Sequence, residues 1–145
     1  DLNSFWSLLD SADVIIGYNS NGFDLVTLKP YYDKDVSLLP SLDLLEVIKK
    51  SIGHRLSLDA VATQTLGTKK IGHGLDAISY YRNKQWDKLA QYCMKDVEIT
   101  RDVYDYGRLH QKLKYLDKNG HLNEAFVDFS FTPTLKPLAT QISLI

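Results

Sequence analysis

The chain has 145 residues, of which 44% are hydrophobic and 24% are charged, and its formal net charge is −1. This composition excludes a disordered or fibrous chain and fits one globular domain. The near-neutral charge also excludes the large basic excess of a dedicated nucleic-acid-binding protein. Any nucleic-acid contact must therefore be local, or be supported by bound cations or by another domain.

The sequence contains no feature of secretion or membrane insertion. No apolar run approaches the roughly 20 residues that a membrane-spanning helix needs, so we expect no membrane contact. The first residues, Asp1 to Ser4, do not form a secretory signal. Cys93 is the only cysteine, which rules out an internal disulfide and fits a reducing compartment. We therefore expect a cytoplasmic protein.

Helix and strand signals alternate in the first 50 residues. Residues 2–11 carry apolar side chains at helical spacing and are predicted to form a helix. Residues 13–18 form a continuous apolar, β-branched run, typical of a strand that is buried on both faces. A turn at 19–22 leads into a predicted helix at 23–31, which ends near its proline. Residues 41–50 are expected to begin as a short strand or turn and to become helical.

Two further helices and a long one follow. Ser57 is the expected N-cap of a helix over 58–66, and Gly67 is its expected C-terminal stop. Residues 68–74 are predicted to form a loop. Its lysines could contact phosphate, but a loop exposed to solvent is the preferred interpretation. Residues 75–82 form a short predicted helix. The longest predicted helix, 85–110, has apolar positions at a spacing of three or four: Leu89, Cys93, Val97, Thr100 and Tyr104.

The C-terminal part changes character. Residues 113–116 and 125–131 are predicted to be strands joined by a turn at 117–120. Residues 132–145 contain two prolines and resemble a tail or linker. Alternating helices and strands indicate an α/β domain over residues 1–131. However, the run at 13–18 is the only clear buried strand before residue 113, which is too few to make a sheet.

The first candidate site motif is the run from Asn19 to Asp24, which follows the predicted strand. Sheets of α/β domains place ligand sites at the carboxyl ends of their strands. Asp24 falls in the first turn of the next predicted helix, where the helix N-terminus stabilises a carboxylate. The alternative is that Asp24 only caps this helix.

The second motif is Tyr92 and Asp96 in the long predicted helix. Residues four apart differ by about 40° around a helix, so these side chains share one face. A phenol beside a carboxylate can orient a water molecule that a metal ion has activated. The alternative is an ordinary tyrosine and aspartate pair at the edge of a core.

Together, Asn-x3-Phe-Asp after an apolar strand and Tyr-x3-Asp in a later helix resemble the second and third motifs of the DEDD exonuclease superfamily. Residues 57–62 look like the middle helix of that family, and residues 114–129 look like the C-terminal part of its YprB-type branch. The histidine subclass places His where this chain has Gln91, whereas the tyrosine subclass places Tyr where this chain has Tyr92. The resemblance is therefore to the tyrosine subclass.

The resemblance implies a ribonuclease H-like fold in which acidic residues hold two Mg²⁺ or Mn²⁺ ions and cleave the terminal phosphodiester at the 3′ end of a single-stranded nucleic acid. It implies metal binding by Asp24 and Asp96 and positioning of the attacking water by Tyr92. It further implies substrate contacts by Asn19 and Phe23. Members of the family are also found fused to helicase or polymerase domains.

The family's first motif, Asp-x-Glu on the first strand, has no match before Asp13. Asp96 and Glu98 have this spacing, but on a helix their side chains point about 200° apart. We therefore expect a chain without the N-terminal strands, with weak metal binding and negligible exonuclease activity. The strand at 13–18 would then lack a neighbour, and an exposed edge invites self-association. The alternative function is a non-catalytic nucleic-acid-binding or scaffold module with a degenerate fold.

Three aromatic side chains and the cysteine have competing interpretations. Trp6 and Trp86 are expected in the core rather than facing a ligand. Cys93 is expected to be a small core residue on a different face from Tyr92. Phe23 could stack on a terminal base, or pack in the core as the first apolar residue of its helix.

Overall fold

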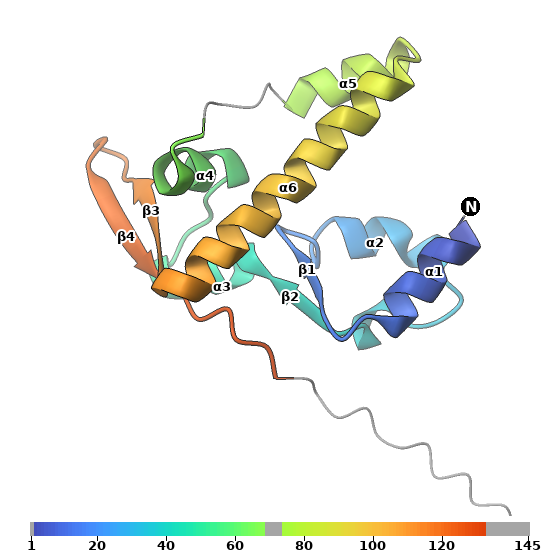
Figure 1. The fold of residues 1–145 in the computed structure, drawn as a ribbon, viewed down its shortest axis with the longest axis horizontal. Coiled ribbons are helices and arrows are strands. Elements are labelled where there is room, and N and C mark those ends of the chain that lie inside the picture. Colours follow the sequence, from blue (N-terminus) through green and yellow to red (C-terminus); the bar gives the residue numbers. More distant parts are fainter. Residues whose placement is uncertain (1, 69–73, 133–145) are drawn as a thin grey trace, which may run out of the picture.

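The structure is a computed structural model that describes residues 2–68 and 74–132 (Figure 1). The predicted loop at 68–74 and the predicted tail at 132–145 lie almost entirely outside these residues. The described elements are, in chain order, α1 (Leu2–Ser11), β1 (Ile15–Gly17), α2 (Asp24–Leu28), the short 3-10 helices η1 (Lys29–Tyr31) and η2 (Val36–Leu38), β2 (Ser41–Asp43), α3 (Leu44–Ile52), α4 (Leu58–Leu66), α5 (Gly74–Arg82), α6 (Trp86–His110), β3 (Lys112–Leu116) and β4 (Leu122–Phe126).

The described strands form two small sheets. β1 and β2 are parallel, with Ile15 opposite Ser41 and Gly17 opposite Asp43, and β3 and β4 are antiparallel. Contrary to the prediction for residues 13–18, β1 is only half-buried. The physical reason is that, within the described residues, β1 pairs with β2 alone, and only one face of its run packs against the core.

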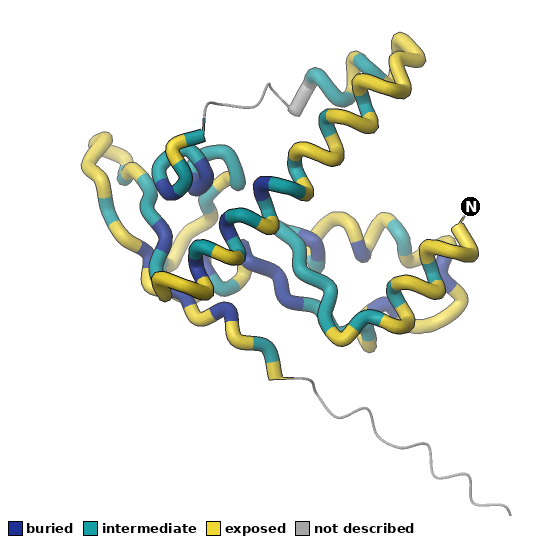
Figure 2. The backbone as a smooth tube through the Cα atoms, viewed as in Figure 1, coloured by how far each residue is buried: buried dark blue, intermediate teal, exposed yellow. Residues whose placement is uncertain are grey.

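The main core lies where α6 crosses the ends of both sheets and meets α3 and α4 (Figure 1). Figure 2 shows most of the buried positions gathered there, while α1 and the N-terminal half of α6 are largely exposed. Five fully enclosed apolar side chains hold these elements together: Leu44, Ile48, Val61, Val103 and Leu113. Phe129, which follows β4, packs directly on α6 at Gly107, where a Cβ atom would fall 2.3 Å from its ring.

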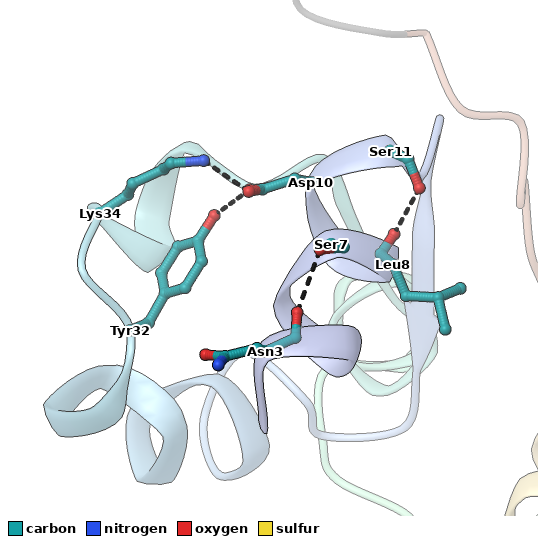
Figure 3. Close-up of polar contacts among 7 residues, drawn as sticks. All are labelled: Asn3, Ser7, Leu8, Asp10, Ser11, Tyr32 and Lys34. Atoms are coloured by element: carbon teal, nitrogen blue, oxygen red, sulfur yellow. Dashed lines mark hydrogen bonds and ion pairs between the residues drawn. The ribbon is translucent and has the colours of Figure 1, made fainter. Parts of the chain in front are cut away.

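Helix α1 buries none of its residues and is attached to the body at one side (Figure 3). The Asp10 carboxylate accepts a hydrogen bond from the Tyr32 hydroxyl and forms an ion pair with Lys34. The Trp6 ring contacts the Tyr32 ring at a centroid distance of 5.2 Å. Trp6 is half-buried by this contact rather than enclosed in the main core.

The predicted ends of α4 are confirmed. The Ser57 hydroxyl accepts a hydrogen bond from the backbone N–H of Ala60 at 3.1 Å, and Gly67 ends the helix with φ of +68°. The prediction of a strand over 125–131 is wrong in its bounds, because β4 covers Leu122–Phe126. Val127 and Phe129 are nevertheless buried at every second position, which explains why their sequence resembles a strand.

The predicted buried face of α6 is wrong. Cys93 is exposed, and the Val97 side chain is 64% exposed. The helix instead buries Ile99, Val103 and Gly107. This face, continued toward the N-terminus at helical spacing, contains Asp96 and then Tyr92. Both candidate site residues therefore lie on the side of α6 that faces the body of the domain.

Candidate active site

The segment after β1 is held in place by a buried carboxylate at the end of β2. Asp43 is only 3% exposed, and its Oδ1 accepts hydrogen bonds from the backbone N–H groups of Asn19 and Leu45 at 2.8 and 3.0 Å. Its Oδ2 accepts one from the N–H of Asn21 at 3.0 Å. Asp43 therefore caps α3 and fixes the turn that leads to α2.

Asn19 has a left-handed backbone conformation, with φ of +63°. Its side-chain Oδ1 accepts a hydrogen bond from Arg55 Nη2 at 2.7 Å. Because Oδ1 faces the guanidinium, the amide NH₂ of Asn19 is directed away from Arg55. The Asn21 side chain is also engaged, since its Nδ2 donates to Glu46 and its Oδ1 accepts from the Ser41 hydroxyl.

Asp24 is the first residue of α2 and thus lies in its first turn, as expected, while the N-cap position is taken by Phe23, which makes no side-chain cap hydrogen bond. The pKa of Asp24 is raised, mainly because the carboxyl group is partly buried. The nearby charge of Asp43 adds to this increase, and a hydrogen bond with the backbone of Asp24 itself opposes it. Phe23, immediately before it, is 63% exposed, which excludes the core-packing alternative for this ring.

Tyr92 and Asp96 are half-buried neighbours on α6. Burial raises the pKa of Tyr92, and the charge of Asp96 raises it further. The phenol is therefore protonated at neutral pH and can donate a hydrogen bond. Burial alone raises the pKa of Asp96. The charge of Asp96 thus affects the pKa of Tyr92, whereas the carboxylate whose charge affects the pKa of Asp24 is Asp43.

Two further carboxylates near Tyr92 were missed in the sequence. Asp76 on α5 and Asp59 in the first turn of α4 both raise the pKa of the Tyr92 phenol. No local pattern could have found them, because they come from two other helices and reach Tyr92 only through the tertiary fold. They make the surroundings of Tyr92 acidic.

The described residues do not by themselves fit a divalent metal ion. Mg²⁺ and Mn²⁺ take several oxygen ligands, and a protein site usually gathers carboxylates around one point. In residues 2–68 and 74–132, no group of three or more His, Cys, Asp or Glu side chains lies close enough to hold a metal. Asp24 and Asp96 are thus at most part of a donor set.

A sequence model of the RNase H superfamily matches residues 2–107, well over half of the chain. The chain belongs to the RNase H superfamily. No curated protein and no solved structure shows significant similarity to it. For this RNase H superfamily domain, the match supports nuclease-type chemistry on nucleic acid, and nucleases of this superfamily generally use divalent metals.

The superfamily match confirms the expected ribonuclease H-like fold class, and the order of helices and strands is that of a mixed α/β domain. It covers α1 to α6 almost completely, and therefore includes the turn after β1 as well as Tyr92 and Asp96. No helix of the described RNase H superfamily domain combines the length and the apolar character needed to cross a bilayer.

Proposed function

We propose that this RNase H superfamily domain is the 3′–5′ exonuclease domain of a tyrosine-subclass, YprB-like enzyme. It would act on the 3′ end of single-stranded nucleic acid, and a helicase or polymerase domain would accompany it. The observation that carries the proposal is the position of Tyr92 and Asp96 on the core-facing side of α6. Superfamily membership and the placement of Asp24 directly after the turn that follows β1 support it.

Each candidate residue has a role that its surroundings support. The protonated Tyr92 phenol would donate a hydrogen bond to the attacking water. The exposed Phe23 ring would stack on the terminal base. The Asn19 amide, turned by Arg55, would donate a hydrogen bond to the substrate end.

Asp24 and Asp96 would contribute to holding Mg²⁺ or Mn²⁺ once further acidic ligands are supplied from outside the described residues. The 145-residue chain alone would therefore bind these metals weakly and have negligible exonuclease activity. Robust Mg²⁺-dependent digestion of single-stranded DNA or RNA by the purified 145-residue chain would contradict this expectation.

A second candidate is a non-catalytic nucleic-acid-binding or scaffold module. It is favoured by the lack of a metal-holding cluster in the described part of the chain. The codons upstream of Asp1 discriminate between the two functions. An apolar strand that carries Asp-x-Glu would support the exonuclease, whereas a start codon directly before Asp1 would support the module.

The direct test uses a protein extended upstream to include such a strand, with 5′-labelled single-stranded DNA and RNA. We expect Mg²⁺-dependent shortening from the 3′ end, at least about 100-fold slower in Asp96→Asn. The matched control is Asp105→Asn, at an exposed position of the same helix. Equal cleavage by Asp96→Asn and the unsubstituted protein would refute the assignment of Asp96.

A further inference from the structure

Two large aromatic side chains are exposed where α5 turns into α6. Tyr81 is 63% exposed and Trp86 is 53% exposed, so the prediction of a core position for Trp86 is wrong. Their rings meet edge to face, with centroids 5.5 Å apart and planes at 80°. Figure 1 shows that α5 and the first half of α6 extend away from the rest of the domain, and Figure 2 shows that their tip is exposed.

Cationic residues flank Tyr81 and Trp86 in the sequence. Arg82, Lys84 and Lys88 are exposed and lie within seven residues of one another, while Asp87 is the single acidic residue of the segment 80–88. This segment therefore has a net charge of +2, although the whole chain has −1. Lys88 Nζ also lies 6.0 Å from the centre of the Tyr80 ring.

We propose that Tyr81 and Trp86, together with Arg82, Lys84 and Lys88, form an aromatic platform that binds single-stranded nucleic acid. Unpaired bases stack on exposed aromatic rings whatever their sequence, and lysine and arginine contact the phosphates between them. A duplex does not offer its base faces to such a surface. Aromatic and cationic residues alternate in this segment, which fits a nucleic acid with its bases and phosphates. An apolar protein surface fits less well, because burying three cations in such an interface is unfavourable.

Part of the platform, Trp86 and Lys88, lies on the same helix as the candidate site residues Tyr92 and Asp96. Trp86 precedes Tyr92 by six residues and Asp96 by ten, which corresponds to about 9 Å and about 15 Å along the axis of α6. A strand held on the platform would therefore end within a few nucleotides of these residues. Delivery of a 3′ end to the site rests on the proposed function, whereas binding to the platform does not.

The test uses Trp86 as its own reporter. The chain has two tryptophans, so Trp6→Phe leaves Trp86 as the only one. Titration with a 12-nucleotide oligothymidylate at low salt should quench the Trp86 fluorescence, and added salt should reverse the quenching. In a parallel anisotropy titration with labelled oligonucleotide, Trp86→Ala and Tyr81→Ala should each weaken binding about 5-fold to 100-fold.

Tyr31→Ala is the matched control, because Tyr31 is 66% exposed, lies beside Lys29 and belongs to a different surface. It should bind as the unsubstituted chain does. The proposal is overturned if the oligonucleotide leaves the Trp86 fluorescence unchanged, or if Trp86→Ala and Tyr31→Ala bind equally well. A Trp86 response to increasing protein concentration alone, without any to the oligonucleotide, would overturn it in favour of a protein interface.

The same measurements separate this proposal from the exonuclease proposal. Oligonucleotide binding through Trp86, combined with an extended protein that cleaves nothing, would refute the exonuclease and leave the platform standing. An extended protein that degrades single strands with the same KM with and without Trp86→Ala would refute the platform and leave the exonuclease standing.

Discussion

The backbone N–H of Asn19 donates a 2.8 Å hydrogen bond to the Asp43 carboxylate, 24 residues later in the chain. The bond joins the carboxyl end of β1 to the carboxyl end of β2, since Gly17 and Asp43 are paired in the parallel register. One buried carboxylate thus sets the path of the segment that leads to Phe23 and Asp24. The substrate and metal contacts proposed for that segment therefore depend on the position of Asp43.

Asp43→Ala should destabilise the fold by about 3 kcal/mol. The change removes the acceptor for three backbone N–H groups, one of which lies in the first turn of α3. Urea denaturation measures the loss, and hydrogen exchange should be faster at the Asn19 and Asn21 amides. Asp33→Ala, at an exposed aspartate, should change neither. Unaltered amide exchange in Asp43→Ala would show that other contacts fix the turn.

Tyr18 gives the domain a pH-dependent stability at alkaline pH. Its hydroxyl donates to the Leu56 carbonyl at 2.9 Å, and burial raises its pKa, with Asp43 raising it further and Arg55 lowering it. Because the pKa of Tyr18 is higher in the folded than in the unfolded state, the stability that the protonated phenol contributes is complete below the unfolded pKa of about 10. This contribution is lost as the pH rises from that value through the folded-state pKa.

Tyr18→Phe should cost about 1 kcal/mol at neutral pH, because the Leu56 carbonyl loses its donor. Since the phenylalanine cannot ionise, the loss of stability between pH 9 and 11 (about one unit on either side of the unfolded pKa) should become smaller. Unfolding in urea at several pH values measures both effects, and Tyr31→Phe serves as the exposed control. An identical alkaline loss in Tyr18→Phe would assign the pH dependence to other groups.

The sequence was sufficient where the signals are local. Ser57 and Gly67 mark the ends of α4 because a hydroxyl cap and a left-handed glycine act within one turn of the helix. The bounds of α6 were also close to those observed, because its helical pattern is long. The Tyr92 and Asp96 pair was found for the same reason, since four residues along a helix fix a shared face.

The sequence failed where contacts depend on the tertiary fold. Cys93 and Val97 are apolar and helically spaced, yet the observed core lies on the opposite side of α6, against Ile99 and Val103. Hydrophobic periodicity cannot tell which of two apolar stripes is covered. The bond from Arg55 to Asn19 spans 36 residues and has no sequence pattern. The exposure of Trp86 depends on how far α6 projects from the core.

Gly107→Ala should destabilise the core by about 1–3 kcal/mol, although alanine favours helices over glycine by about 1 kcal/mol. A Cβ at this position would fall 2.3 and 2.6 Å from two ring carbons of Phe129, which is 2% exposed. Thermal unfolding measures the change. In a double-mutant cycle, Phe129→Leu should relieve part of the cost, because the clash involves the ring edge. Additive effects of the two changes would show that the helix and not the ring absorbs the strain.

The free edge of β1 should cause the 145-residue chain to self-associate. Within the described residues β1 hydrogen-bonds to β2 on one edge only, and its segment is apolar. Val14, Ile16 and Tyr18 pack against the core, so Ile15 points to the other face.

Size-exclusion chromatography with light scattering should show a mass that rises with protein concentration. Ile15→Lys should reduce that rise, because a charge on an edge strand opposes pairing. The exposed control Leu109→Lys should leave it unchanged. A monomeric mass at every concentration would mean that the β1 edge is protected.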